Sequence, residues 1–526
     1  MRSIFTFLLT LIVSATTSAQ SVSVAQDNVA NSGSMFYFHQ RKVARTPNGT
    51  LLVTWATKNA AAGGQVMYSV YDPAFQQWSP PVALSNAAST GVAFQSALAA
   101  DELGNIHATW QQTSSLASPV RYQVFYSKFN GLSWTTPKKV SLNDNETSEE
   151  PTIEVDSKGG LWVVYNNDGA GVGKEWIFAV NSTDGGNTWS TAADTLCKVG
   201  TLGTSIEVAR VALAPGPSGR LVALWDNSLA GSSARRETYV NQYDGTKWQG
   251  EVRISDTTSV DRDHGRYGTI TMDNQSNIYA FYLQDIIASA DTRLRKVAMH
   301  KKGWNDTWST KATLIIDSSR ISFRDLSAVT DSSGVVHFTY RRDVAADTSY
   351  GLDENVYTFS KNGGSTWSAP IVLSRPNRDA GYGTIANRVR KAYGIDFAWR
   401  ESRDINKNDQ DTTAVLYGNV PYRLVTAIEE PAIPSSFDLV RNYPNPFNPS
   451  TTIEYQVAVH GRVTLVVYDA LGREVNTLFT GVANAGAYKL SWDGKDNSKH
   501  LLSSGVYFVR LLTERSSQLV KTVLLK

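Results

Sequence analysis

Polar side chains recur at equivalent places in the sequence, each time directly after an apolar stretch that ends in Trp or Tyr. From Trp110 onward, these closing aromatic residues are followed by Gln111, Gln112, Asn166, Asn167, Asp168, Asp226, Asn227, Gln284, Asp285, Arg341, Arg342, Asp343, Arg400, Glu401 and Arg403. Amides, carboxylates and guanidiniums together offer many hydrogen bonds to hydroxyl groups, and arginine can hold a carboxylate through two parallel bonds. This chemistry is typical of a carbohydrate or uronate site.

A second polar set precedes the same apolar stretches. It consists of His39, Arg41, Glu149, Glu150, Glu207, Arg210, His264, Arg266, Tyr267, Arg324, Asp325 and Tyr382. From both sets we select the candidate ligand-binding residues Arg41, Glu207, Asp226, His264, Arg266, Arg324, Arg341, Tyr382, Arg400 and Glu401. The alternative is that these residues only solvate loop ends, as any fold with many loops requires.

The elements that must position these residues are repeated hairpins. The closing aromatic residues stand at 55, 110, 165, 225, 282, 340 and 399, each at the end of a strand–turn–strand phrase such as VARTPNGTLLVTW. A second hairpin phrase with Gly and Trp, such as NQYDGTKW, lies between them, so each repeat supplies four strands. We therefore predict an all-β, seven-bladed β-propeller over residues 20–420, its last blade completed by residues 21–26. Six blades plus an irregular extra segment is the alternative.

One turn carries a family resemblance. STDGGNTW (182–189) matches the pattern Ser-x-Asp-x-Gly-x-Thr-Trp, and SKNGGSTW (360–367) has Asn362 in place of the Asp; SKFNGLSW (127–134) aligns Phe129 there. The match resembles the Asp box of the sialidase-like propellers. We expect Asp184 to accept backbone N–H bonds within its turn, which is a structural role and not that of a catalytic acid.

The two ends of the chain predict export. Residues 1–19 combine Arg2, an apolar run and small residues before Gln20, which is typical of a secretory signal peptide. The run is about half the 18–20 apolar residues that a membrane span needs, and no later stretch qualifies. The mature chain is therefore expected to lack a transmembrane segment. Pro421, Pro431 and Pro434 mark residues 421–436 as a linker.

Residues 437–526 have a different texture, with a proline-rich entry, NYPNPFNPST, and strand-like segments separated by turns. They predict a small immunoglobulin-like β-sandwich. Through NYPNPFNPST, VYDALGREV, the WDG turn and KTVLLK, the segment resembles the type A C-terminal sorting domain of the type IX secretion system. The resemblance implies a Gram-negative bacterium, secretion machinery as partner, and a protein that is released or held on the outer cell surface. An ordinary adhesion module is the alternative.

Composition excludes other classes. The 50 Lys and Arg against 48 Asp and Glu provide no basic surface for nucleic acid, and the single Cys197 cannot form an internal disulfide. No His/Cys spacing predicts zinc and no glycine loop predicts phosphate binding. We expect no cofactor apart from a possible structural calcium: Asp404, Asn406, Asn408 and Asp411 are spaced rather like a calcium loop, without its Gly and distal Glu. A solvated turn is the alternative.

Three functions remain open. The first is a non-catalytic propeller that binds glycans or polysaccharides at a polar channel mouth. The second is a sialidase-type glycosidase. The resemblance implies that Arg324, Arg400 or Arg41 bind the substrate carboxylate and that Tyr382 acts with Glu207. However, the segment HQRKVART (39–46) lacks the family's Arg-Ile-Pro motif. The third is a uronate polysaccharide lyase that uses His264, Arg266 and Tyr267. Whether the protein is an enzyme stays open.

Overall fold

The computed structural model of this chain describes residues 20–30, 40–57, 64–86, 91–115, 120–168, 175–198, 208–229, 232–255, 266–289, 292–308, 312–314, 323–343, 353–376, 378–402, 413–422, 425, 438–457, 461–483, 486–513 and 517–526, with a few gaps at single residues or side chains within them. The chain divides into two compact units, residues 1–359 with 369–427 and residues 360–368 with 428–526. Within the described ranges, no helix has the length and apolar character needed to cross a membrane.

Among its described residues, the first unit contains seven sheets of four or five strands, which we number sheet 1 to sheet 7 along the chain. Sheet 1 comprises β2 (Val43–Arg45), β3 (Leu51–Ala56), β4 (Val66–Asp72), β5 (Gln77–Trp78) and β6 (Val82–Ala83); sheet 2 comprises β7 (Ala93–Ala100), β8 (Ile106–Ser115), β9 (Arg121–Phe129) and β10 (Lys138–Lys139). Sheet 3 comprises β11 (Thr147–Val155), β12 (Leu161–Asp168), β13 (Glu175–Ser182) and β14 (Asp194–Lys198); sheet 4 comprises β15 (Val208–Pro215), β16 (Leu221–Leu229), β17 (Ser232–Tyr243) and β18 (Val252–Arg253); sheet 5 comprises β19 (Arg266–Met272), β20 (Asn277–Ser289), β21 (Thr292–Gly303) and β22 (Ala312–Leu314). Sheet 6 comprises β23 (Phe323–Thr330), β24 (Val336–Asp343), β25 (Asp353–Ser360) and β26 (Ile371–Val372); sheet 7 comprises β27 (Asp379–Ile385), β28 (Ile395–Ser402), β29 (Thr413–Val420) and β1 (Gln20–Ala30). One 3₁₀ turn, η1 (Pro217–Gly219), links β15 to β16.

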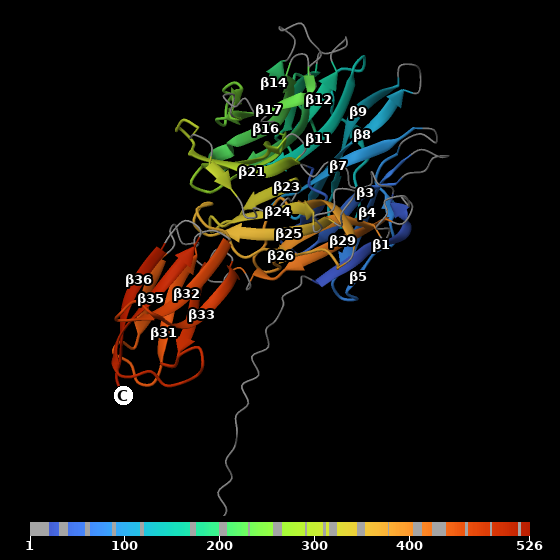
Figure 1. Ribbon diagram of the computed structural model, residues 1–526. Helices are drawn as coiled ribbons and strands as arrows, with labels where there is room; N and C mark the ends of the chain where they lie inside the picture. Colours follow the sequence, from blue (N-terminus) through green and yellow to red (C-terminus); the bar gives the residue numbers. More distant parts are fainter. Residues whose placement is uncertain are drawn as a thin grey trace, which may run out of the picture. The chain divides into compact units, whose positions relative to one another are not determined.

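The sheets close into a ring. The first strand of each sheet from β7 to β27 contacts the first strand of the next, and β2 contacts both β7 and β28. The colours of Figure 1 follow this order from blue to orange. The last sheet is completed by the N-terminal strand, because β1 pairs antiparallel with β29, Val22 opposite Tyr417. The all-β propeller and its completion by the N-terminal segment are confirmed.

The core lies between neighbouring sheets, since each buried cluster draws residues from two of them. Between sheets 1 and 2, Ala44 and Leu52 pack with Leu98 and Trp110. Between sheets 7 and 1, Val24 of β1 is buried with Trp55 and Val415. Burial of these aliphatic and aromatic faces is the main stabilising term. The cluster between sheets 7 and 1 exists only when the ring is closed.

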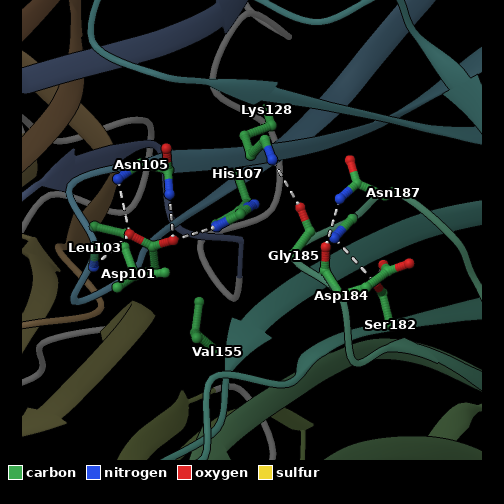
Figure 2. Close-up of polar contacts among 12 residues, drawn as sticks. Asp101, Leu103, Asn105, His107, Lys128, Val155, Ser182, Asp184, Gly185 and Asn187 are labelled. Carbon is green, nitrogen blue, oxygen red and sulfur yellow. Dashed lines mark hydrogen bonds and ion pairs between the residues drawn. The ribbon is translucent and has the colours of Figure 1, made fainter.

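Aspartates shape the turns at one end of the sheets. The Asp101 carboxylate accepts the N–H groups of Leu103 (2.9 Å) and Asn105 (2.7 Å) and lies 3.1 Å from His107 Nε2, as Figure 2 shows. Each carboxylate of this kind accepts the amides two and four residues further on, a pattern that recurs at Asp156, Asp273 and Asp331. These hairpins therefore have the same local cause of folding.

The Asp-box turn behaves as predicted. Asp184 accepts the Thr188 N–H (2.9 Å) and the hydroxyls of Thr188 (2.6 Å) and Ser182 (2.8 Å). These bonds, those from Thr188 first, hold the pKa of the Asp184 carboxyl well below its usual value, so it is no proton donor. Gly186 has φ +85° and Trp189 packs 4.9 Å from the Tyr126 ring of sheet 2.

The alignment of Phe129 with the Asp-box carboxylate is wrong. Phe129 bridges Trp134 in a shorter turn. There the side chain of Asn130 accepts the N–H groups of Leu132 (3.0 Å) and Ser133 (2.9 Å). Asn130 therefore does the work that Asp184 does in the Asp-box turn, one position later in the aligned phrase, because fewer residues separate the two strands in this turn.

The C-terminal unit contains a β-sandwich of two sheets with seven strands in total. Its strands are β30 (Asp438–Tyr443), β31 (Thr451–Val457), β32 (Gly461–Asp469), β33 (Glu474–Ala483), β34 (Gly486–Trp492), β35 (Gly505–Thr513) and β36 (Ser517–Leu524). Phe447, Ile453, Val467 and Trp492 belong to its buried core. The predicted immunoglobulin-like sandwich is confirmed.

Candidate functional site

The innermost strands carry a repeated backbone distortion at the end opposite to the Asp-box turns. Pairing with the second strand slips by one residue in six sheets, at Phe94/Ala97, Glu149/Thr152, Ala209/Ala212, Arg266/Thr269, Arg324/Ser327 and Gly381/Thr384. Within each bulge one residue other than glycine has positive φ: Gln95 (54°), Glu150 (51°), Arg210 (61°), Tyr267 (56°), Asp325 (54°) and Tyr382 (56°). Such a conformation costs about 1–2 kcal/mol per residue. We call these six residues the bulge ring.

The bulge ring is held by hydrogen bonds between sheets. Gln111 Oε1 accepts the Glu150 N–H (2.8 Å), Glu150 Oε2 accepts the Arg210 N–H (3.0 Å), and Asp325 Oδ2 accepts the Tyr382 N–H (2.8 Å). A side chain of one sheet thus fixes the strained amide of the next. Bulges re-aim side chains. Here Gln95, Glu150 and Asp325 are buried, whereas Arg210, Tyr267 and Tyr382 are partly exposed.

Half-exposed ring residues form two arginine–tyrosine groups. The Arg210 guanidinium lies 4.3 Å from the Tyr267 ring centre. The Tyr382 ring is approached by Arg341 at 5.7 Å and Arg400 at 5.2 Å, so sheets 6 and 7 meet at this tyrosine. The structure therefore brings together three candidates that lie far apart in the sequence.

These arginines are already paired with carboxylates. Arg341 lies 2.8 Å from Asp325 and 3.1 Å from Asp353, and Arg400 lies 3.5 Å from Asp379. Burial opposes the charge of Arg341, but its carboxylate neighbours raise the pKa of its guanidinium above the usual value. Arg341 therefore stays charged, and the ion pairs fix the positions of both arginines.

Sheets 2 and 3 contribute an acidic and aromatic sector. Glu149 is half-buried, and burial, followed by the charges of Asp168 and Glu150, raises the pKa of its carboxyl to about 7. Burial and the nearby Glu149 also raise the pKa of Tyr122, whose ring meets Phe94 edge-on at 5.5 Å. The sector combines an aromatic surface with a carboxyl that titrates near neutral pH.

Two further candidates are buried acceptors. Asp226 is 1% exposed and lies 3.1 Å from Arg236 and 3.5 Å from Arg210. Glu401 is also 1% exposed; it pairs with Arg375 at 2.6 Å and accepts the Trp399 Nε1–H at 2.9 Å. Both carboxylates lie below the surface and already have these partners, and their role in ligand binding stays a prediction.

Arg41 lies inside the ring. Its guanidinium donates to Ser327 Oγ (3.2 Å), Ala328 O (2.7 Å) and Ile385 O (3.1 Å) and faces Glu154 at 3.7 Å. Burial lowers the pKa of the Arg41 guanidinium, although the nearby Glu154 carboxylate acts to raise it. Since these partners belong to sheets 3, 6 and 7, Arg41 spans the ring below the mouth, and its donors are occupied.

The other predicted site residues fall outside the described part. This holds for Glu207 and His264, for the side chains of Arg266 in β19 and Arg324 in β23, and for the calcium candidates Asp404, Asn406, Asn408 and Asp411. These assignments stay predictions. Across the described ranges, no three His, Cys, Asp or Glu side chains are grouped to hold a metal ion.

Sequence reasoning placed Glu149 and five of the six bulge-ring residues in the polar set before the apolar stretches, but it missed the backbone strain that the ring residues share. The repeated phrases RYGTIT (266–271) and GYGTIA (381–386) were the available signal, because both place a tyrosine at the strained position. Sequence reasoning also missed the raised pKa of Glu149, because that shift depends on the folded neighbours of its carboxyl.

Comparison with known proteins agrees with this architecture. The family of the FlgD Ig-like domain matches residues 450–517, and no curated protein matches the chain. Two solved structures of an ulvan lyase of family PL25, one bound to -[GlcA(1-4)Rha3S]- and one without it, are similar to this chain. Each gives TM-score 0.52 at 12% sequence identity, and the alignment covers 78% of this chain and 100% of the lyase chain. A mutant sialidase of Trypanosoma rangeli gives TM-score 0.43 at 10% identity, covering 96% and 88%. At this identity, the lyase similarity shows a shared β-propeller fold.

Proposed function

We propose that the protein is an exported β-propeller that binds a polysaccharide at the channel mouth. The observation that carries this proposal is the bulge ring, in which strained backbone holds polar and aromatic residues at the same end of six sheets, three of them partly exposed. Strain of this kind persists only where the surrounding structure enforces it, and it gathers at functional sites. Glycine would relieve the strain, yet Arg210, Tyr267 and Tyr382 occupy these positions.

Electrostatics favour recognition through hydroxyl groups. Arg341 and Arg400 already face Asp325, Asp353 and Asp379, so a ligand carboxylate would have to displace an existing partner. Sugar hydroxyls can instead donate to carboxylates and accept from guanidiniums without breaking these pairs. The ulvan lyase with a related propeller was solved bound to a sugar chain, which is in line with polysaccharide as the ligand class.

A polysaccharide pull-down with the full chain tests this function. Tyr267→Ala removes the partner of Arg210 at the mouth, and we expect it to weaken binding at least tenfold. Tyr393→Ala is the matched control, because Tyr393 stacks on Arg45 at 5.0 Å in the turn at the opposite end of sheet 7. Equal binding by wild type and Tyr267→Ala, or no binding across neutral and acidic polysaccharides, would refute the mouth as the site.

Export by the type IX secretion system is the second part of the proposal. It is supported by the signal-like residues 1–19 and by the NYPNPFNPST and KTVLLK motifs of the C-terminal segment. In a Gram-negative host with this machinery, we expect the full chain in the medium or on the cell surface. A chain lacking residues 437–526 should accumulate in the periplasm. Export of the shortened chain would refute the sorting role.

Cleavage of the bound polysaccharide is the alternative function, and Glu149 is the observation that favours it. With a pKa of about 7, its carboxyl could donate a proton to a leaving oxygen at neutral pH. A lyase would release an unsaturated product that absorbs in the ultraviolet, and a sialidase would turn over a fluorogenic sialoside. Either activity should be lost in Glu149→Gln. Absence of both activities in the wild type leaves binding as the function.

A further inference from the structure

A cavity of about 270 Å³ opens between sheets 3 and 4, at the Asp-box end of the sheets. Its lining includes Asp156, Lys158, Trp162, Asn181, Thr183 and Tyr243. Strand β11 runs from Thr147 at the mouth to Val155, just before Asp156, so the cavity and the mouth lie at opposite ends of the same strand. No residue of the bulge ring lines it.

A side-chain bridge found at both neighbouring sheet junctions is missing at the cavity. Lys128 of sheet 2 donates from Nζ to Gly185 O of sheet 3 (3.1 Å), as Figure 2 shows, and Gln242 of sheet 4 donates to Trp304 O of sheet 5 (3.2 Å). The equivalent residue of sheet 3 is Asn181. The backbone carbonyls of Lys128, Asn181 and Gln242 each accept the N–H of the residue directly after the tryptophan of the second hairpin, which is Thr135, Ser190 and Gln249 respectively. Asparagine is too short to bridge.

The lining has unused polar groups. In the part of the chain that the structure describes, the side chains of Lys158, Asn181 and Thr183 have no hydrogen-bond partner. Asp156, in contrast, is engaged by the Trp162 indole (3.0 Å) and by turn amides. The cavity thus offers an ammonium, an amide and a hydroxyl at one rim.

The lining also includes two aromatic side chains, Trp162 and Tyr243. The rings of Trp162 and Tyr243 lie 4.6 Å apart, and Trp248 packs 5.4 Å from Tyr243. The charges of Asp156 and Lys158 cancel within the lining, which disfavours phosphate and other strongly anionic ligands. The volume lies near the lower limit of ligand pockets, about 300–1,000 Å³, and suits one or two sugar units.

We propose that this cavity is a second carbohydrate site, which binds a neutral pyranose unit between sheets 3 and 4. The sugar hydroxyls bond to Lys158, Asn181 and Thr183, and its C–H face packs on Tyr243. The site is independent of the mouth, so a polysaccharide chain could be held at either end of the sheets.

The test measures binding of neutral trisaccharides (maltotriose, cellotriose, mannotriose and xylotriose) to the full chain by calorimetry. Asn181→Lys introduces the side chain that bridges the preceding junction, and it should fill the cavity while the fold is kept. We expect at least one trisaccharide to bind wild type and Tyr267→Ala alike, and to bind Asn181→Lys at least tenfold more weakly. Thr183→Ala should weaken binding to a smaller degree.

Controls separate this site from the mouth. The melting temperature of Asn181→Lys should equal or exceed that of wild type, which excludes misfolding as the cause of lost binding. Binding lost in Tyr267→Ala but kept in Asn181→Lys would assign the ligand to the mouth and overturn the second site. No binding of any neutral trisaccharide, or binding of sulfated or uronate oligosaccharides alone, would also overturn it.

Discussion

Glu149 should make the stability of the propeller depend on pH. Its carboxyl has an ordinary pKa of 4.5 and a folded-state pKa of about 7, because it is buried near Asp168 and Glu150. Between these values the unfolded chain loses a proton that the folded chain keeps, so stability falls as pH rises. The shift corresponds to about 3 kcal/mol, at about 1.4 kcal/mol per pKa unit, fully expressed above pH 7.

Glu149→Gln removes this penalty without changing the shape of the side chain. We expect equal stability of variant and wild type near pH 4, and a gain of up to about 3 kcal/mol for the variant at pH 8. Urea unfolding followed by tryptophan fluorescence measures the difference, and it reports chiefly on the propeller because Trp492 is the only tryptophan after residue 400.

The exposed Glu251 provides the matched control. Glu251→Gln should change stability by less than about 0.5 kcal/mol at both pH values. A Glu149→Gln effect that is constant with pH, or a variant that loses stability at pH 8, would refute the assigned environment of Glu149.

Three further predictions concern the frame. Arg41→Met removes the ion-pair partner of the buried Glu154, which keeps its hydrogen bond from Asn387, and urea unfolding at pH 7 should show a loss of about 3 kcal/mol; adding Glu154→Gln should restore part of it. Asp184→Ala should lower the melting temperature by removing the turn bonds, whereas Asp184→Asn should keep it, as an asparagine fills the equivalent turn elsewhere; a lower melting temperature for both would contradict this. Gly186 has positive φ, and Gly186→Ala would push its methyl group into the Tyr126 hydroxyl, so calorimetry should show a loss of more than about 1 kcal/mol; a neutral result would count against the close packing there.

The hairpins and their repetition could be predicted from the sequence because their causes are local. Asp184 and Gly186 shape a turn through bonds to residues at most four positions away, and the period of Trp110, Trp225 and Trp399 makes the repeat visible. The polar residues after these tryptophans were found for the same reason. Their roles could not be predicted: Asp226 and Glu401 turned out to be buried acceptors.

Sequence alone therefore determined the kind of element, the repeat and the set of polar residues, since turn chemistry and strand alternation act over a few neighbouring residues. Only the tertiary structure decided which of them meet. Packing of sheet 6 against sheet 7 brings Arg341 to the Tyr382 ring, which Arg400 of the paired strand also approaches. Closure of the ring places Arg41 across from Glu154. The raised pKa of Glu149 and the cavity beside Asn181 likewise arise from contacts between sheets, because burial and electrostatics depend on distance in space and not along the chain.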